Sequence, residues 1–255
     1  MHLYLSAGYE ERSVVPHRYK THSVGYRRVD MVDHSMGSVH TGIGICRLEP
    51  DGYVDLHIHA NEKGIYVLEG KLEMKHGLES FRLSIDDYAL IPYGVAHAFR
   101  NRGNKAVRWF EVQAPQPKPA GGWQDTFFVG DAAWPERVEN ADFGSPLTQF
   151  AGHFDEKTRG QSKPFGPTTY RFLHKEFGAQ QLTLMRGELS GGGTCDLGDH
   201  AVEESYLVVS GEVDLEMEGK MYHLCPGDVA WTGVGASHAF FNRGSAPVRW
   251  IETQA

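Results

Sequence analysis

Residues 97–114 have the sequence HAFRNRGNKAVRWFEVQA, and residues 238–255 have the sequence HAFFNRGSAPVRWIETQA. The two stretches lie 141 residues apart, and the same offset relates further positions upstream without insertion or deletion. Because a constant offset over this length is typical of an internal repeat, we expect two copies of one structural unit. Identical residues at this offset include His59 and His200, Gly70 and Gly211, Asp87 and Asp228, Gly94 and Gly235, His97 and His238, and Asn101 and Asn242.

The composition predicts a soluble globular chain. Its 255 residues are 40% hydrophobic, which suits two cores in units of roughly 100 residues each. The formal charge of -8, without a basic stripe, disfavours nucleic acid and membranes as partners. No segment resembles a leader peptide or a membrane span, so we expect a cytoplasmic location. The three cysteines, Cys46, Cys195 and Cys225, lack the spacing of a disulfide frame or a zinc knuckle.

Each copy consists of short segments rich in β-branched and aromatic residues. Residues 65–74 and 206–217 are typical of a bent strand or hairpin around a glycine. Residues 83–94 and 224–235 place a short apolar strand between two turns. Neither copy contains a long apolar stripe at helical spacing. We therefore expect an all-β fold of two tandem barrels.

A connector separates the copies. The Pro- and Gly-rich residues 114–122 end the first copy near residue 118. The aromatic residues that follow indicate that the connector packs across the barrels. Within it we expect a short helix from Trp134 to Asn140 and a mobile loop over residues 154–167. The expected domains are residues 1–118 for the N-terminal barrel, 119–165 for the connector and 166–255 for the C-terminal barrel.

Two motifs recur in each copy. The first copy has Gly52-x4-His57-x-His59-x3-Lys63-x6-Gly70 and Asp86-x5-Pro92-x-Gly94-x2-His97-x3-Asn101, and the second has His200-x3-Glu204-x6-Gly211 and Gly227-x5-Gly233-x-Gly235-x2-His238-x3-Asn242. These motifs resemble the motif pair of the cupin superfamily, and the whole chain resembles a bicupin. The resemblance covers nearly everything except the first ~40 residues and the connector, and it implies double-stranded β-helix (jelly-roll) barrels. It leaves the activity open, because this fold serves dioxygenases, decarboxylases, isomerases, hydrolases and binding proteins.

These motifs supply two candidate sets of metal ligands. In a His-x-His strand both side chains point to one face, and ligands from later strands can close on the same ion. Three or four nitrogen and oxygen ligands suit a divalent transition metal such as Fe, Mn or Zn and leave positions open for substrate. The first set is His57, His59 and His97, and the second set is His200, Glu204 and His238.

Each set departs from the pattern that the resemblance implies. The second copy has Gly198 where the first histidine belongs. The first copy has Lys63 where a glutamate ligand belongs, and Glu62, one residue earlier, faces the other way in a regular strand. An ammonium about 5 Å from a divalent ion is repelled by roughly 6 to 7 kcal/mol at an effective dielectric of ~20.

Three alternatives follow for the first copy: its site is metal-free, Lys63 is turned aside, or Lys63 is neutral and acts as a catalytic base or holds an anionic substrate. We expect the second copy to be slightly the better metal site. Asn101 and Asn242 are interpreted as turn residues. Arg108 with Glu111, and Arg249 with Glu252, are interpreted as structural ion pairs along a strand.

The leading functional hypothesis is a metal-dependent enzyme that acts on a small polar or carboxylate-bearing molecule, with a non-haem iron dioxygenase preferred. A hydrolase or isomerase is the second hypothesis, since residues 227–233 are distantly similar to those of ureidoglycine aminohydrolases, bicupins for which the family implies manganese. A non-catalytic binding protein is the third, because both ligand sets are incomplete. A homo-oligomer is expected, because exposed sheet edges in such barrels are often paired.

Overall fold

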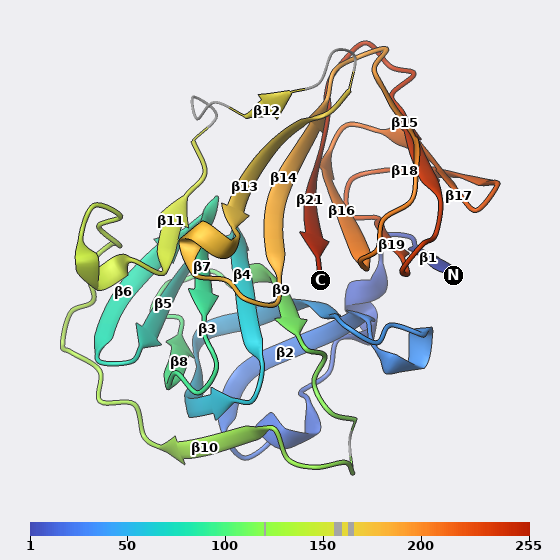
Figure 1. Ribbon diagram of the computed structural model, residues 1–255. Helices are drawn as coiled ribbons and strands as arrows, with labels where there is room; N and C mark the ends of the chain where they lie inside the picture. Colours follow the sequence, from blue (N-terminus) through green and yellow to red (C-terminus); the bar gives the residue numbers. More distant parts are fainter. Residues whose placement is uncertain (120, 156–159, 163–165) are drawn as a thin grey trace.

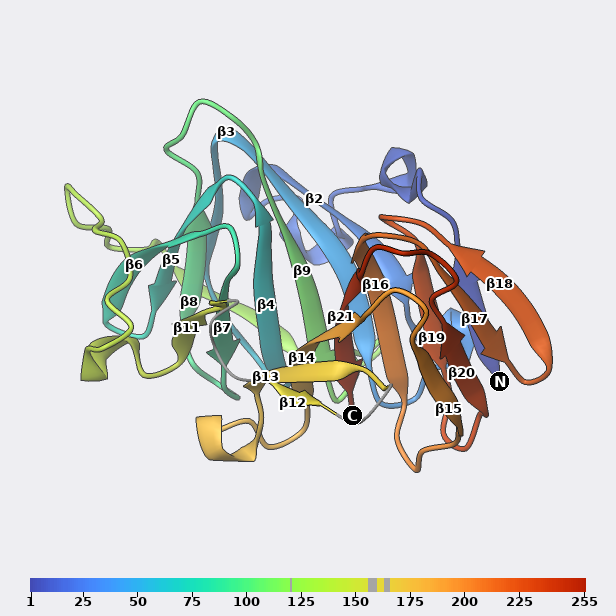
Figure 2. The same ribbon diagram turned by 90° about the horizontal axis from the view of Figure 1, so that it is seen from above.

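The computed structural model describes residues 1–119, 121–155, 160–162 and 166–255. Two β-barrels lie side by side, the first drawn in blue to green and the second in yellow to red (Figures 1 and 2). The only helices in these residues are short 3-10 turns, so the predicted all-β class is confirmed. The turns are η1 (Tyr9–Arg12), η2 (His17–Tyr19), η3 (His34–Met36), η4 (Pro146–Thr148) and η5 (Lys175–Phe177).

One long strand organises the first barrel. β3 (Gly42–His59) pairs through its first half with β9 (Val107–Ala114) and through its second half with β8 (His97–Arg100), so it belongs to both faces of the barrel. The register with β8 places His57 opposite His97, which brings the two histidine motifs together. The other strands of this barrel are β2 (Ser23–Val32), β4 (Glu62–Glu69), β5 (Lys71–His76), β6 (Glu79–Ser84) and β7 (Asp87–Ile91).

The second barrel repeats this layout with one interruption. β14 (Thr183–Leu189) and β15 (Thr194–Gly198) correspond to the two halves of β3, and the break between them is the run Ser-Gly-Gly-Gly at residues 190–193. Gly192 has a φ of 73°, a conformation that side chains disfavour. The remaining strands are β12 (Gln161–Ser162), β13 (Thr168–Leu173), β16 (Glu204–Ser210), β17 (Val213–Met217), β18 (Lys220–Leu224), β19 (Val229–Thr232), β20 (His238–Phe241) and β21 (Val248–Gln254).

Strands from outside the duplicated units complete the barrel edges. β11 (Ala151–His153) pairs with β7 of the first barrel, and β1 (His2–Leu5) pairs with β19 of the second. β7 and β19 occupy the same repeat position. The first barrel thus gains an edge strand from the segment before the second barrel, and the second barrel gains one from the segment before the first. β10 (Thr126–Gly130) pairs with the end of β3. These additions cover strand edges that would otherwise be open to aggregation.

The connector forms no helix between Trp134 and Asn140, so that prediction was wrong. The backbone of Glu139 and Ala141 instead exchanges hydrogen bonds with Arg82 on β6, at 2.8 and 3.0 Å. Pairing with the edge of β6 satisfies backbone groups that a short isolated helix would satisfy poorly. Of the expected mobile loop, residues 156–159 and 163–165 lie outside the described residues.

Three hydrophobic clusters hold the molecule together. One fills the first barrel around Trp109 and Phe99, and one fills the second barrel around Trp250 and Phe240. The third lies between the barrels and combines residues of both copies. The central cluster makes the two barrels one packed unit; it includes Val29, Ile43, Ile45, Phe110, Val112, Leu184, Leu207, Trp231 and Ile251.

The asparagines of the second motif hold turns, as predicted. The side-chain amide of Asn101 donates to the carbonyls of Leu48 and Lys105 at 3.0 and 2.8 Å. Asn242 does the same to Leu189 and Ala246 at 2.9 and 2.8 Å. Each asparagine thus ties the start of its turn to a neighbouring strand.

The predicted arginine–glutamate pairs along β9 and β21 were wrong. Arg108 pairs with Glu69 and Arg249 pairs with Glu188, on the outside of the barrels. Residues three apart in a strand point to opposite faces, so Glu111 lies inside the barrel while Arg108 lies outside. The carboxylates of Glu111 on β9 and Glu252 on β21 therefore point into the barrels.

Candidate metal centre

Three histidines converge inside the first barrel. His57 and His59 come from the end of β3 and His97 begins β8, and the three side chains are 0%, 4% and 0% exposed. One ring nitrogen of each lies within 4.8 Å of the others. The Nε2 atoms of all three are buried without a hydrogen-bond partner. Buried polar atoms normally have partners, and three imidazole nitrogens that meet at one point form a donor set that fits a metal ion.

The other ring nitrogen of each histidine is held in place. Nδ1 of His57 donates to the carbonyl of Asp55 at 2.7 Å, and Nδ1 of His97 donates to that of Val95 at 2.9 Å. Nδ1 of His59 lies 3.1 Å from the hydroxyl of Thr126 on β10. A proton on Nδ1 leaves Nε2 with a free lone pair, which is the arrangement of metal-binding histidines.

The environment keeps these imidazoles neutral. Burial, helped by the nearby Lys63 ammonium, lowers the pKa of His57 to about 3. Burial also holds the pKa values of His59 and His97 well below their usual range, with Lys63 and the neighbouring histidines contributing. A neutral imidazole is the form that binds a metal ion.

Lys63 is paired inside the same barrel. Its Nζ lies 3.3 Å from Oε2 of Glu111, whose other oxygen pairs with Arg28. Burial lowers the pKa of Lys63, and Glu111 offsets part of this effect. Burial raises the pKa of Glu111, but Lys63 and Arg28 outweigh it and leave that pKa below its usual value. Lys63 thus has a counter-ion inside the barrel, and the three alternatives for the first copy stay predictions.

Aromatic side chains from outside the repeat cover the histidine cluster. The rings of Tyr19 and Phe128 lie 5.5 and 5.3 Å from the ring of His57, measured between centroids. Phe128 also stacks on His22 at 3.9 Å. Tyr19 belongs to η2 and Phe128 to β10, so the cap over the first site is built from the N-terminal segment and the connector.

The second candidate set is brought together differently. His200, Glu204 and His238 also have ligand atoms within 4.8 Å, but the side chain of His200 is 52% exposed. The hydroxyl of Tyr206 donates to Glu204 at 3.0 Å and lies 3.1 Å from Nε2 of His238. Nδ1 of His200 and the amide of Gln254 contact the two oxygens of Glu204 at 2.8 and 2.7 Å. Within the described residues, the ligand atoms of this set therefore satisfy one another.

The charge inside the second barrel is the reverse of that in the first. Glu204 stands at the position of Lys63, and Glu252 stands at the position of Glu111. Burial, with Glu204 contributing, raises the pKa of Glu252 to about 7. Two buried carboxyl groups without a cation between them disfavour each other's ionisation, and this raises the pKa of one of them.

Sequence reasoning identified the six candidate ligands but missed four of their neighbours. Thr126 lies outside the repeat and belongs to no motif. Tyr206 stands at the position of Ile65, so aligning the two copies would have shown a hydroxyl-bearing side chain next to the second ligand set only. Glu111 was assigned to the wrong partner, and Arg28 precedes both motifs.

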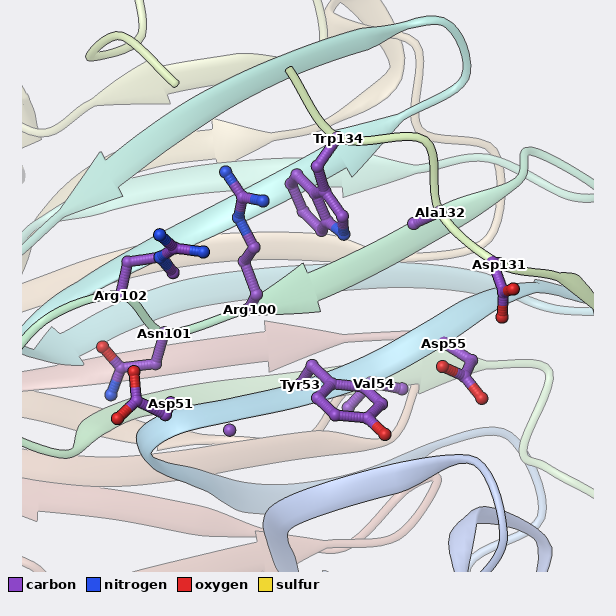
Figure 3. A pocket seen from close by; sticks show the side chains of 11 residues that line it. Asp51, Tyr53, Val54, Asp55, Arg100, Asn101, Arg102, Asp131, Ala132 and Trp134 are labelled. Atoms are coloured by element: carbon purple, nitrogen blue, oxygen red, sulfur yellow. The ribbon is translucent and has the colours of Figure 1, made fainter. Parts of the chain in front are cut away.

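Two other features lie away from the six ligands. Glu212, His223 and Cys225 gather on the surface of the second barrel, where Nδ1 of His223 is already engaged by Asp214 at 2.8 Å. A recess of about 360 Å³ opens outside the first barrel, with Tyr53 and Trp134 on opposite sides (Figure 3). None of the six candidate ligands lines this recess.

Two jelly-roll barrels from one duplicated unit, with histidines gathered inside, define the class of bicupins. Comparison with known families agrees, because the cupin domain model matches residues 44–113 and 185–253. The chain belongs to the cupin family. The similarity to ureidoglycine aminohydrolases stays a prediction.

Two curated relatives come from Streptomyces. The polyketide synthase CurC of Streptomyces cyaneus is 33% identical over 94 residues, which are 36% of this chain and 61% of that protein. The tetracenomycin polyketide synthase protein TcmJ of Streptomyces glaucescens is 32% identical over 117 residues, which are 45% of this chain and 78% of that protein. The match to CurC thus spans less than two thirds of its length.

Solved structures share the fold over 90% or more of the chain. Salicylate 1,2-dioxygenase from Pseudoaminobacter salicylatoxidans, in adducts with gentisate, has a TM-score of 0.77 at 14% identity and covers 100% of this chain and 81% of its own. Oxalate decarboxylase from Lactobacillus farciminis has a TM-score of 0.66 at 16% identity and covers 90% of this chain and 81% of its own. At this identity the likeness establishes the fold. The described part of the chain contains no candidate membrane-spanning helix.

Proposed function

We propose that the protein is a metal-dependent enzyme whose metal is bound in the first barrel by His57, His59 and His97. The observation that carries this proposal is the convergence of three buried Nε2 atoms that lack partners. Each unsatisfied buried polar atom costs about 1 to 3 kcal/mol, and a bound ion removes that cost at all three. The proposal reverses the expectation that the second copy is the better metal site.

The substrate that suits this site is a small molecule with a carboxylate or another anionic oxygen. Three protein ligands leave coordination positions open. Lys63 and Arg28 are balanced by Glu111 and Asp30, so the positive charge that would attract an anion is that of a bound divalent ion. When bound, a divalent ion supplies Lewis acidity and, in the case of iron, redox chemistry with O₂. The protein would bind and orient the substrate under the cap of Tyr19 and Phe128 and exclude water from it.

Among reaction types we favour a dioxygenase. A site of three neutral imidazoles in a dry, aromatic-lined interior is compatible with Fe(II). The shared fold with salicylate 1,2-dioxygenase supports this choice as an analogy. Hydrolysis and isomerisation need no redox-active metal, so consumption of O₂ separates them from the favoured reaction.

The second barrel has a different proposed role. Its Tyr206 hydroxyl lies within hydrogen-bond distance of both Glu204 and His238, where a metal would compete with it. We propose that this barrel binds metal weakly and serves as a structural or small-molecule-binding partner of the first.

Metal analysis of matched variants tests the assignment. Protein prepared without added metal is loaded with Fe(II) or Mn(II) and desalted, and bound metal per chain is measured by mass spectrometry. We expect one equivalent in the wild type and in His238→Ala, and none in His57→Ala. Retention of the metal in His57→Ala with loss in His238→Ala would move the centre to the second barrel. Absence of metal from every preparation would leave only a binding function.

An oxygen electrode tests the reaction type. The Fe(II)-loaded protein is presented with a panel of hydroxylated aromatic acids and with oxalate. We expect O₂ uptake with one class of aromatic acid, with both atoms of ¹⁸O₂ recovered in the product. Turnover of an aromatic acid without O₂ uptake would contradict the dioxygenase, and turnover of oxalate without O₂ uptake would indicate a decarboxylase.

A further inference from the structure

The three histidines of the first barrel are not oriented in the same way. His57 and His97 donate from Nδ1 to the carbonyl two residues earlier in their own strand. His238, the counterpart of His97, does likewise with Ala236 at 3.1 Å. His59 alone among the three depends on a side chain, the hydroxyl of Thr126, which lies outside the duplicated unit.

Thr126 is itself held by a charged pair. Its hydroxyl donates to Oδ1 of Asp125 at 3.2 Å, and the Asp125 carboxylate also pairs with Arg18 and accepts the backbone N–H of Lys118. Because the Thr126 proton goes to Asp125, the hydroxyl oxygen accepts from His59. Nδ1 of His59 must then carry the ring proton, and its Nε2 lone pair is free to bind metal.

The backbone fixes the position of this relay. β10 pairs antiparallel with β3, placing Thr126 opposite His59 and Phe128 opposite His57. The N–H of Ala60 donates to the carbonyl of Asp125 at 2.8 Å. Alternation along β10 then directs Thr126 and Phe128 to the face that carries the histidines.

The second barrel lacks this arrangement in the described part of the chain. His200 stands at the position of His59, but its Nδ1 contacts Glu204 rather than a hydroxyl supported from outside. Among the described strands, β15, the counterpart of the end of β3, pairs only with β20. The half-exposed ring of His200 is consistent with the loss of such support.

We propose that Thr126 and Asp125, braced by Arg18, are positioning residues that fix the tautomer and orientation of His59 for the metal of the first barrel. The proposal rests on the proposed function, since it assumes that His59 is a metal ligand. In this proposal the connector and the N-terminal segment supply side chains that complete the first of the two duplicated sites. This contribution adds to the difference at the first ligand position, where the second copy has Gly198 in place of His57.

The test is metal affinity in Thr126→Val and Thr126→Ser, with Co(II) alone as the probe and its visible absorption as the readout. Loss of an outer-shell partner typically weakens metal binding 10- to 100-fold. We expect that loss and an altered Co(II) spectrum in Thr126→Val, with affinity within about threefold of the wild type in Thr126→Ser. Asp125→Asn should weaken binding less than Thr126→Val. Thr194→Val, on the exposed part of β15, is the matched control and should bind as the wild type does.

The outcomes separate this inference from the proposed function. Equal affinity and an identical Co(II) spectrum in Thr126→Val and the wild type would overturn the positioning role while leaving the metal site intact. If the wild type binds no Co(II), or if His57→Ala binds Co(II) as the wild type does, the proposed function fails and this inference fails with it. Circular dichroism and thermal unfolding of the metal-free variants establish that they fold. If Thr126→Val does not fold, equal affinities of Asp125→Asn and the wild type would overturn the proposal.

Discussion

Glu62 and Glu203 occupy the same position in the two copies, and each carboxylate binds the backbone of the opposite half of the molecule. Glu62 accepts from the N–H groups of Gln180 and Gln181 at 2.8 to 3.1 Å. Glu203 accepts from the N–H groups of residues 39–41 at 2.7 to 3.2 Å. Residues 39 and 40 are the repeat counterparts of 180 and 181. The two glutamates therefore clamp the interface between the barrels with approximate two-fold symmetry, as an isologous dimer contact would.

This relationship predicts that Glu62→Gln and Glu203→Gln each destabilise the protein by about 1 to 3 kcal/mol, because a charge-assisted acceptor of several buried donors is replaced by a neutral amide. The double variant should lose more than either single variant. Urea unfolding followed by fluorescence measures the change in the free energy of unfolding.

Glu136→Gln is the control for this comparison, since Glu136 is exposed on the connector and should tolerate the change within 0.5 kcal/mol, roughly. A clamp variant as stable as this control would show that the central hydrophobic cluster alone holds the barrels together.

The second site predicts a gain of metal binding when Tyr206 is changed to the residue of the other copy. Tyr206→Ile removes the hydroxyl that contacts Glu204 and His238, and Ile65 already fills that position in the first barrel. We expect a second equivalent of Mn(II) per chain, weaker than the first, by isothermal titration. Tyr206→Ile in a His238→Ala background should add no equivalent of Mn(II). A second equivalent in that double variant would mean that the added metal binds outside the His200, Glu204 and His238 set.

The lysine of the first barrel predicts a change in metal affinity. Lys63→Met removes a buried ammonium that acts on all three histidines, so repulsion of a bound cation falls. We expect Mn(II) to bind roughly tenfold more tightly, a modest gain because Glu111 already offsets part of the charge. Lys71→Met, on the exposed start of β5, is the matched control. Unchanged affinity in Lys63→Met would mean that the ion pair fully screens the lysine from the site.

The sequence was sufficient for the fold and for the candidate ligands. The constant offset of 141 residues and the alternation in His57-x-His59 can both be read from the sequence alone, so the two barrels and the shared face of the histidines could be predicted. The direction of Glu62 followed from the same alternation, because it points away from Lys63 and toward the other barrel. The expected pairing of Arg108 with Glu111 ignored that alternation and was wrong.

The remaining parts of the site depend on tertiary contacts that no local pattern encodes. Thr126 reaches His59 only because β10 pairs with the end of β3 in one particular register. β1, with four residues, is too short to be assigned to the second barrel from its sequence. The contact of Tyr206 with His238 depends on how deeply its ring lies in the barrel.

The opposite surroundings of Glu111 and Glu252 predict opposite dependences of stability on pH. The pKa of Glu252 is raised to about 7 from an ordinary 4.5, so the folded state holds a proton that the unfolded chain releases. The contribution of Glu252 to stability is then intact below pH 4.5 and lost as the pH rises to about 7. Glu252→Gln cannot titrate and so does not show this loss. The free energy of unfolding of Glu252→Gln minus that of the wild type should therefore be roughly 3 kcal/mol larger at pH 8 than at pH 4.5.

Glu111→Gln is the matched variant and should show the reverse trend. Lys63 and Arg28 hold the pKa of Glu111 below its usual value, so its contribution is present at neutral pH and lost as the pH falls through that lowered pKa. Urea unfolding of Glu252→Gln between pH 4.5 and 8, and of Glu111→Gln from neutral pH down to well below 4.5, measures the two trends. Parallel pH profiles for the two variants would show that the charge environments of the barrels do not differ as the structure indicates.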